Sequence, residues 1–183
     1  MPTSPKRRLL PRLRTASLKS GEGVKVEHAV TIDRPVGEVF LYWRNLENLP
    51  LFMTDLYMVT QTTPTVSHWV VRTDNGLTLQ WDAQIIEERE NEMISWRSLP
   101  DADLDNAGSV WFTPAAGGRG TVVKLSMKYS PPGGKIAVGL AKIFKDDPKK
   151  HVVEDLFRFK SLLEAGEIPT TRGQPSGDPS AKR

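Results

Sequence analysis

Hydrophobic and polar residues alternate with a period of two in several segments between residues 24 and 130. The clearest case is LTLQWDAQIIEERE (77–90), in which apolar residues occupy every second position from Leu77 to Ile85. This period is typical of a strand with one buried face. The dipeptide Asn75-Gly76 just before it is a strong hairpin signal. Six other segments have strand character and lie at 24–32, 55–63, 67–73, 93–99, 109–115 and 121–130.

Helical spacing replaces this alternation in two regions. Residues 34–53, RPVGEVFLYWRNLENLPLFM, predict a short amphipathic helix and then a second short helical turn interrupted near Pro50. We expect Asp33 to cap the first of these helices, with Pro35 in its first turn. Apolar residues at helical spacing from Ile136 onward predict a long C-terminal helical region that bends at Pro148 and ends at Gly166.

The order of these elements is a strand, two short helices, six strands and a long helix. An antiparallel sheet with one polar face must bury its other face, and the C-terminal helix carries the largest apolar stripe available to cover it. We therefore predict an α+β fold in which a curved antiparallel sheet of about seven strands grips the C-terminal helix. The two short helices after the first strand would close one end of the concave face.

This order of elements resembles a known group of proteins, the START-like (SRPBCC, helix-grip) superfamily. It is similar to the polyketide cyclase/dehydrase and lipid-transport branch, and within it to small bacterial proteins related to coenzyme Q-binding START domains. The resemblance implies a deep apolar pocket between the sheet and the long helix, which binds a lipid, a quinone-like molecule or a polycyclic molecule. The segments that carry it are TIDRPVGEVFLYWRNLENLPLFM, SHWVVRT, LQWDAQIIEERENEMISWRSL, NAGSVWFTPAAGGRGTVVKLSMKYSPPGG and EDLFRFKSLLEAGEIPTT.

The formal net charge of +3 is unevenly distributed along the chain. Residues 1–23 hold six basic residues and one acidic residue, whereas residues 24–168 carry more acidic than basic side chains. We expect a disordered basic tail over 1–23, one ligand-binding domain over 24–168 and a disordered tail over 169–183. Residues 6–19 are a candidate for weak contact with an anionic membrane, but they lack an aromatic residue for stacking on bases, so no specific nucleic acid is predicted. A cytoplasmic location, including the membrane periphery, fits this composition.

Several kinds of reactive site are excluded or disfavoured. The chain has no cysteine, which rules out disulfides, thiolate zinc sites and cysteine nucleophiles. The spacing of Asp101, Asp103 and Asp105 lacks the glycine and glutamate of a calcium loop, and a solvated loop is the better interpretation. We therefore predict neither a metal nor a cofactor, and we find no convincing catalytic set.

The aromatic residues on apolar strand rows are the candidates for a ligand-binding cavity, because flat apolar faces suit planar rings. Three polar residues, His28, Ser98 and Tyr129, are candidates for contacts inside it, and Trp111 is expected to point outward. We predict a sheet wall, a helix wall and a lid. They consist of Trp69, Trp81, Ala83, Trp96, Phe112 and Met127 (sheet), Leu140 and Phe144 (helix), and Trp43, Phe52 and Met53 (lid).

Three functions remain open at this point. The first is binding of an apolar small molecule without catalysis. The second is a polyketide cyclase or aromatase-type enzyme, which would use a polar residue in the cavity. The third is a regulatory or membrane-surface protein that docks through its basic N-terminal tail. The ligand, the oligomeric state and the pathway are not written in the sequence.

Overall fold

The computed structural model describes residues 23–72, 76–130 and 148–166. These residues form one antiparallel sheet of seven strands in the order β1-β7-β6-β5-β4-β3-β2, together with helices α1 and α3. The predicted helix-grip α+β fold is confirmed. The strands are β1 (Val24–Ile32), β2 (Leu56–Gln61), β3 (Val66–Arg72), β4 (Thr78–Arg89), β5 (Met93–Ser98), β6 (Asp105–Pro114) and β7 (Thr121–Ser130), and the helices are α1 (Val36–Arg44), α3 (Pro148–Ala165) and the 3₁₀ helices η1 (Leu46–Leu51) and η2 (Ala116–Gly118).

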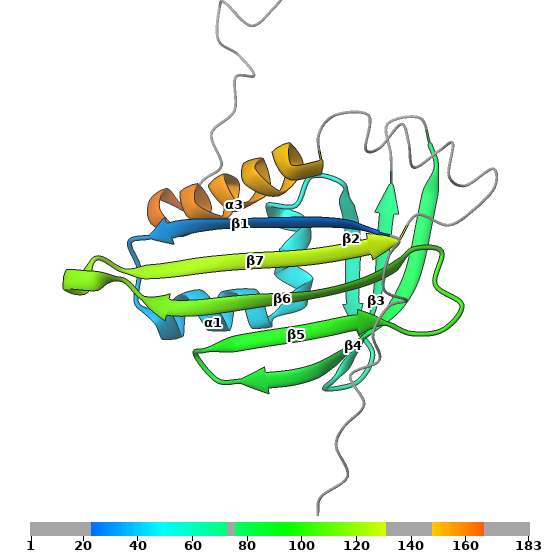
Figure 1. Ribbon diagram of the computed structural model, residues 1–183, viewed down its shortest axis with the longest axis horizontal. Coiled ribbons are helices and arrows are strands. Elements are labelled where there is room, and N and C mark those ends of the chain that lie inside the picture. Colours follow the sequence, from blue (N-terminus) through cyan, green and yellow to red (C-terminus); the bar gives the residue numbers. More distant parts are fainter. Residues whose placement is uncertain (1–22, 73–75, 131–147, 167–183) are drawn as a thin grey trace, which may run out of the picture.

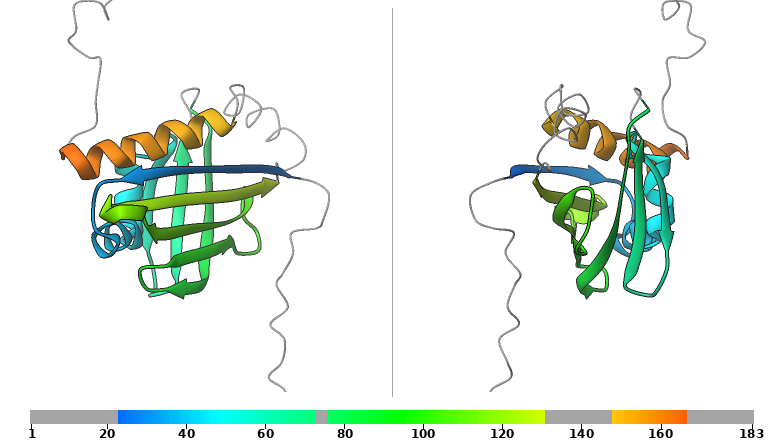
Figure 2. Two further views of the ribbon diagram at one scale, coloured as in Figure 1. Left: turned by 60° about the vertical axis from the view of Figure 1, so that its left-hand side comes forward. Right: turned by 90° about the vertical axis from the view of Figure 1, so that its right-hand side faces the viewer.

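The sheet is strongly curled, and the helices lie on its concave side. In Figure 1, β1, β7, β6 and β5 run across the view, whereas β2 and β3 stand steeply to them. The change of direction passes through β4, whose pairing with β5 shifts register between Ile85 and Glu87. Such a bulge bends its strand and increases the local twist. The turned views in Figure 2 show α1 and α3 on the hollow side of the curl.

The alternation read from the sequence corresponds to the two faces of the sheet. In β4 the side chains of Leu79, Trp81, Ala83 and Ile85 are buried, and the residues between them are exposed or half-buried. β1 likewise buries alternate residues. The apolar row therefore faces the helices, as period two requires.

A cluster of aromatic rings fills the end of the concave face at which the short helices lie. Trp43 of α1 packs against Phe52, Phe112 and Phe159, with ring centroids 5.5, 6.2 and 5.2 Å away. Phe52 and Phe159 stack on one another at 4.6 Å. Each of these four side chains is at most 3% exposed. We call these four residues the aromatic hub. Their contacts pack α1, the end of η1, β6 and α3 against one another.

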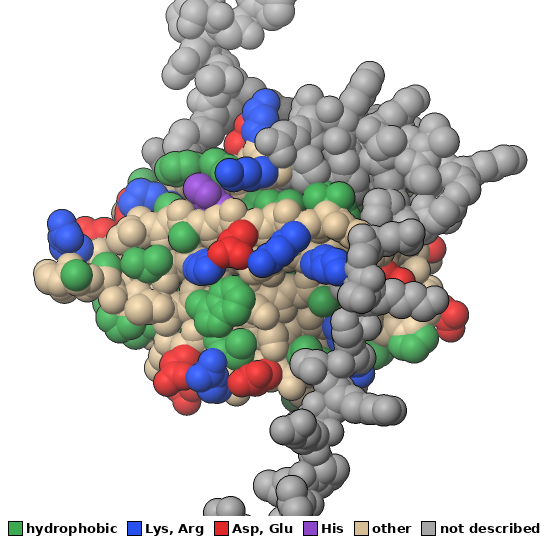
Figure 3. All heavy atoms as spheres, viewed as in Figure 1, with side chains coloured by type: hydrophobic (Ala, Val, Ile, Leu, Met, Phe, Trp, Pro, Cys, Tyr) green, Lys and Arg blue, Asp and Glu red, His purple; other side chains and the backbone are tan. Residues whose placement is uncertain are grey.

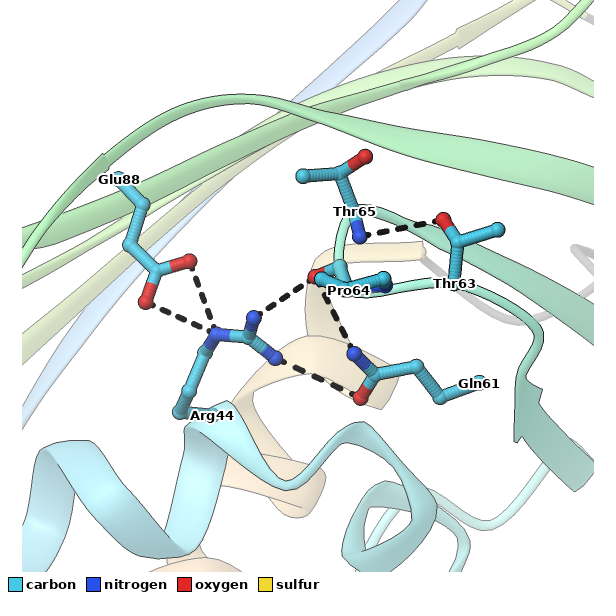
Figure 4. Close-up of polar contacts among 6 residues, drawn as sticks. All are labelled: Arg44, Gln61, Thr63, Pro64, Thr65 and Glu88. Carbon is cyan, nitrogen blue, oxygen red and sulfur yellow. Dashed lines mark hydrogen bonds and ion pairs between the residues drawn. The ribbon is translucent and has the colours of Figure 1, made fainter.

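Polar contacts connect the helices α3 and α1 to the sheet at two places. Near the C-terminus of α3, Lys160 Nζ donates to the carbonyl of Thr31 at 2.7 Å, and Glu164 Oε1 accepts from the Asp33 amide at 2.7 Å. Figure 4 shows the second place, at the C-terminal end of α1, where the Arg44 guanidinium lies between β4 and the β2–β3 turn. Its Nε lies 2.9 Å from both Glu88 carboxylate oxygens, and one of its Nη atoms donates to the Pro64 carbonyl at 2.9 Å.

Some expected details of the elements are wrong. Asp33 does not cap α1: Pro35 is the N-cap residue, no side chain caps the helix, and the Asp33 amide bonds to Glu164. The sixth strand begins at Asp105, four residues before the expected start, because 105–108 pair with β7 in register.

The expected helical stretch 136–147 and the two predicted tails lie largely outside the described residues, so the tails and the domain limits stay predictions.

The outer face of the sheet carries charges of both signs between scattered apolar side chains (Figure 3). Glu27 forms ion pairs with Lys25 and Lys124, and Lys124 lies over the ring of Trp111 at 5.7 Å from its centroid. Trp111 therefore points outward, as its position in β6 predicts. Within the described ranges, none of the helices has the length and apolar content needed to cross a bilayer.

Gly108 is expected to be required for the packing of Trp96. An ideal Cβ at this position would lie 2.4 Å from Cζ2 of the Trp96 ring, so Gly108→Ala should move the indole or the strand. We expect the free energy of unfolding to fall by about 1–3 kcal/mol, as for other overpacked cores, when measured by urea denaturation. Gly37→Ala is the control, because its Cβ would meet only Asn91 Oδ1 at 3.6 Å. Equal stability of the two variants would contradict the expectation.

Candidate functional site

The concave face is not filled along its whole length, and a cavity of two compartments remains. The larger compartment has a volume of about 150 Å³ and the smaller one about 40 Å³. Both are lined by Met53, Trp69, Trp81, Asn106 and Met127, which therefore lie between them. An apolar cavity of about 150 Å³ is large enough to take up a benzene ring.

The smaller compartment lies between the short helices and the middle of the sheet. The helices bring three apolar side chains to it because α1 and η1 turn one face toward the strands. The strands contribute the rest of its apolar lining and one hydroxyl. Besides the five shared residues, its lining consists of Trp43, Leu46 and Leu49 from the helices and Ser67, Ala83, Ile85, Ile94 and Trp96 from the strands.

The larger compartment lies between the sheet and the N-terminal half of α3. Most of its lining is apolar, its charged and histidine side chains come from α3 and from the segment just before β2, and the sheet adds Asn106 and Tyr129. Strands on both sides of the curl contribute to it, which is a consequence of the bend in the sheet. Besides the shared residues, it is lined by Val26, Leu56, Val71, Leu79, Leu104, Leu125 and Tyr129, and by Asp55, His151, Val152 and Asp155.

Two tryptophans form a stacked pair in the wall between the compartments. Trp69 and Trp81 face each other across β3 and β4, with ring centroids 6.1 Å apart and ring planes 17° apart. The Nε1 of Trp69 donates to Ser67 Oγ at 2.8 Å. The Nε1 of Trp81 is buried and has no hydrogen-bond partner among the described residues. Within this stacked pair, one indole donor is therefore satisfied and the other is not.

A group of polar side chains borders the larger compartment on the α3 side. Nδ1 of His151 lies 3.3 Å from Asp55 Oδ2. Asp155 Oδ1 accepts hydrogen bonds from the amide and the hydroxyl of Thr54, at 3.1 and 3.2 Å. Burial raises the pKa of the Asp155 carboxyl to about 6, although the Thr54 hydrogen bonds act in the opposite direction. We call Asp55, His151 and Asp155 the polar rim.

The structure brings together part of the set that the sequence predicts. Of the expected wall and lid residues, Phe52 and Phe112 line neither compartment, because both pack in the aromatic hub. Leu140 and Phe144 lie outside the described residues. The expected residues that line the cavity are Trp43, Met53, Trp69, Trp81, Ala83, Trp96 and Met127. Their contact with a ligand stays a prediction.

The three expected polar contacts differ in position. Tyr129 lines the larger compartment and is 5% exposed. His28 lines neither compartment and lies beside Phe157, an exposed residue of α3, with ring centroids 6.4 Å apart. Ser98 also lies outside the cavity lining, and its hydroxyl accepts from the Asn106 amide at 3.1 Å. Of the three, Tyr129 lines the cavity, and its contact with a ligand stays a prediction.

Reasoning from the sequence missed the polar rim. Neither His151 nor Asp155 is among the predicted site residues, but both line the larger compartment, and His151 reaches Asp55 across the cavity border. A signal was present, since both residues lie at helical spacing on the stripe that continues to Phe159. Asp55, which precedes β2, carried no such signal. In the described ranges, no group of three or more His, Asp or Glu side chains is arranged to hold a metal ion.

Comparison with known proteins gives consistent matches. Residues 32–157 match the model of a family described as polyketide cyclase/dehydrase and lipid transport. An uncharacterized 17.2 kDa protein of the melC2-rnhH intergenic region of Streptomyces lincolnensis is 31% identical over 153 residues, which cover 84% of this chain and 94% of that protein.

Two solved structures show the same fold. DR_A0006 from Deinococcus radiodurans has a TM-score of 0.65 at 36% identity, and the match covers 78% of this chain and 98% of that one. The Zhui aromatase/cyclase from Streptomyces sp. R1128 has a TM-score of 0.57 at 14% identity, covering 80% and 100% of the two chains. At that identity the second likeness concerns the fold alone.

Replacing Asp155 is expected to change the pH dependence of stability. Because its pKa lies near 6 in the folded chain and near 3.8 without burial, the folded protein holds a proton that the unfolded chain releases between these values. The free energy of unfolding of the wild type should therefore fall as pH rises from 4 to 6. Above pH 6 to 7, Asp155 should cause no further change in it. Asp155→Asn should remove this loss, on the order of 2 kcal/mol at pH 7 relative to pH 4.

Urea denaturation of both proteins at several pH values between 4 and 8 measures this difference. Glu154→Gln, exposed on the same helix, controls for the removal of a negative charge. A stability difference between Asp155→Asn and the wild type that stays constant across this range would show that the carboxyl titrates normally.

Proposed function

The chain belongs to the polyketide cyclase/dehydrase and lipid-transport family, and from this premise we propose that it binds an apolar, ring-bearing small molecule in its two-compartment cavity. The observation that carries the proposal is the apolar hollow between the sheet and α3, lined on its inner wall by stacked indoles. A ligand would lie with a ring in the larger compartment and with part of its structure reaching toward the smaller one.

The energetic cost of the hollow supports this proposal. Empty cavity volume destabilises a core by about 24 cal/mol per Å³. The larger compartment, at about 150 Å³, would therefore cost roughly 4 kcal/mol if nothing filled it. The free energy of unfolding of a domain is only about 5–15 kcal/mol, so an empty cavity of this size would remove a large fraction of it. A ligand that fills the space recovers contacts that the core lacks.

The chemistry of the walls favours planar rings over other apolar shapes. Trp69 and Trp81 present broad faces, and ring pairs in offset or edge arrangements gain about 0.5–1.5 kcal/mol beyond area burial. Met53 and Met127 lie beside both compartments and supply flexible side chains that adapt to irregular ligands. Among lipids, quinone-like molecules and polycyclic aromatics, these walls favour the two ring-bearing classes.

A second candidate function is a cyclase-type reaction on such a ligand. It is favoured by the polar rim, because a carboxyl whose pKa lies near 6 exchanges protons readily at neutral pH. His151 Nδ1 and Asp55 Oδ2, 3.3 Å apart, place an imidazole and a second carboxyl on the same border. Conversion of a bound compound, followed by mass spectrometry, would distinguish this function from binding alone.

Val152→Phe is the direct test of the binding site. Val152 lines the larger compartment, and a benzyl side chain in its place would occupy the space of the ligand ring. We expect the affinity for ethylbenzene, measured by titration of the intrinsic tryptophan fluorescence, to fall at least tenfold. The loss follows from steric exclusion, since one ring fills a cavity of this size.

Val153→Phe is the matched control, because it adds the same ring one position further along α3 to a residue outside the cavity lining. It should bind ethylbenzene as the wild type does. Wild-type protein that binds no member of an ethylbenzene, naphthalene and fatty-acid panel, and that releases no small molecule on organic extraction, would refute the proposed function.

A further inference from the structure

The two stacked indoles of the cavity wall differ in one respect, the state of their N–H groups. Both side chains are 8% exposed and both line the two compartments. Trp69 Nε1 donates to Ser67 Oγ, a hydroxyl two residues away on the same strand. Trp81 Nε1 is buried and has no acceptor within the parts of the chain that the structure describes. Two tryptophans of one stacked pair therefore differ in whether the indole N–H has an acceptor.

A buried N–H group without an acceptor is unusual in a folded protein. Tryptophan N–H groups normally find a partner when they are buried, because desolvation without a new hydrogen bond is unfavourable. The position directly opposite Trp81 in β3 is Trp69, which offers no acceptor atom in its side chain. On the β5 side, the register places Ser98 opposite Ala83. The Ser98 hydroxyl already accepts a hydrogen bond from the backbone N–H of Asn106. The local strands therefore leave this donor without a partner.

The cavity is the space from which an acceptor can come. Trp81 belongs to the wall shared by both compartments, so its indole meets any molecule that occupies either of them. The shared wall also contains the side-chain amide of Asn106, whose Nδ2 already donates to the Leu104 carbonyl at 3.0 Å. The other residues of that wall are Met53, Trp69 and Met127, so Trp81 Nε1 is a donor without a partner among the described residues, in a largely apolar enclosure. A few placed polar groups in an apolar pocket are what fixes the orientation of a small-molecule ligand.

We infer that Trp81 Nε1 is a specificity-determining donor, and that the ligand carries a neutral oxygen acceptor, a ring carbonyl or its equivalent, which this N–H binds. The inference rests on the proposed function, since it specifies the chemistry of the molecule in the same cavity. It assigns to the ligand a polar atom at the wall between the compartments and an apolar ring beside it.

The polar rim argues for a neutral oxygen rather than a carboxylate. Asp55 and Asp155 border the larger compartment, and His151 is already engaged with Asp55. Among the described residues, the basic side chain beside Asp155 is Arg158, which donates through Nη1 to the Thr54 hydroxyl at 2.7 Å. A ligand carboxylate would be held near two acidic side chains, which repel it. Ketones and quinones avoid this repulsion and still accept from an indole N–H.

Acetophenone and ethylbenzene test the inference, because they match in size and differ in the carbonyl oxygen. Titrations of the full-length protein should show acetophenone bound about threefold to tenfold more tightly than predicted from apolar transfer alone, the gain of one neutral hydrogen bond. Trp81→Phe should lower the ratio of acetophenone to ethylbenzene affinity by the same factor. Trp69→Phe is the matched control and should leave the ratio unchanged, since its N–H is already bound to Ser67.

A second measurement needs no variant that might fold poorly. In ¹⁵N-labelled wild-type protein, one of the five indole N–H signals should move downfield with acetophenone and not with ethylbenzene. An unchanged affinity ratio in Trp81→Phe, or no indole signal that responds to the carbonyl, would overturn the inference while ethylbenzene binding still upheld the proposed function. Failure of both compounds to bind would instead count against the proposed function.

Discussion

The packing of four aromatic rings at one end of the concave face is the constraint on which the rest of the structure depends. Trp43, Phe52, Phe112 and Phe159 come from a short helix, the end of a 3₁₀ helix, a central strand and the C-terminal helix. Rings of this size bury large apolar areas and fit in few mutual orientations. Once they are packed, the position of α3 over the sheet is set, and so is the part of the concavity that stays open.

The hollow follows from the shape of the sheet. A sheet that turns sharply at the bulge in β4 has a deep concave face, and one helix cannot fill it. The C-terminal half of α3 is fixed by Lys160 and Glu164 at the end of β1, and its middle packs through Phe159. Its N-terminal half is left to form a wall of the larger compartment through Val152 and Asp155. The same helix thus closes the core at one end and borders the cavity at the other.

This division explains why the apolar stretch 34–53 has two roles. Phe40 and Phe52 are core residues, as their burial and ring contacts show. Leu46, Leu49 and Met53 reach the cavity, and Trp43 does both. Helical spacing in the sequence predicted the helices and their buried face, but it could not distinguish residues that meet other side chains from residues that meet a space. That distinction depends on the curvature of the sheet, to which β4 and β5 contribute residues far away in the chain.

The sequence by itself determined the order of elements and the face of each strand that is buried, because these depend on local periodicity and on segments that can be read one at a time. The family was indicated by resemblance to a known group, and the match over residues 32–157 shows it. Tertiary structure decided three other features: the early start of β6, where Gly108 accommodates the Trp96 ring; the engagement of Asp33 by Glu164 in place of a helix cap; and the polar rim, which joins Asp55 to a helix almost a hundred residues later. Each of these depends on contacts between distant segments, whose energies no local pattern records.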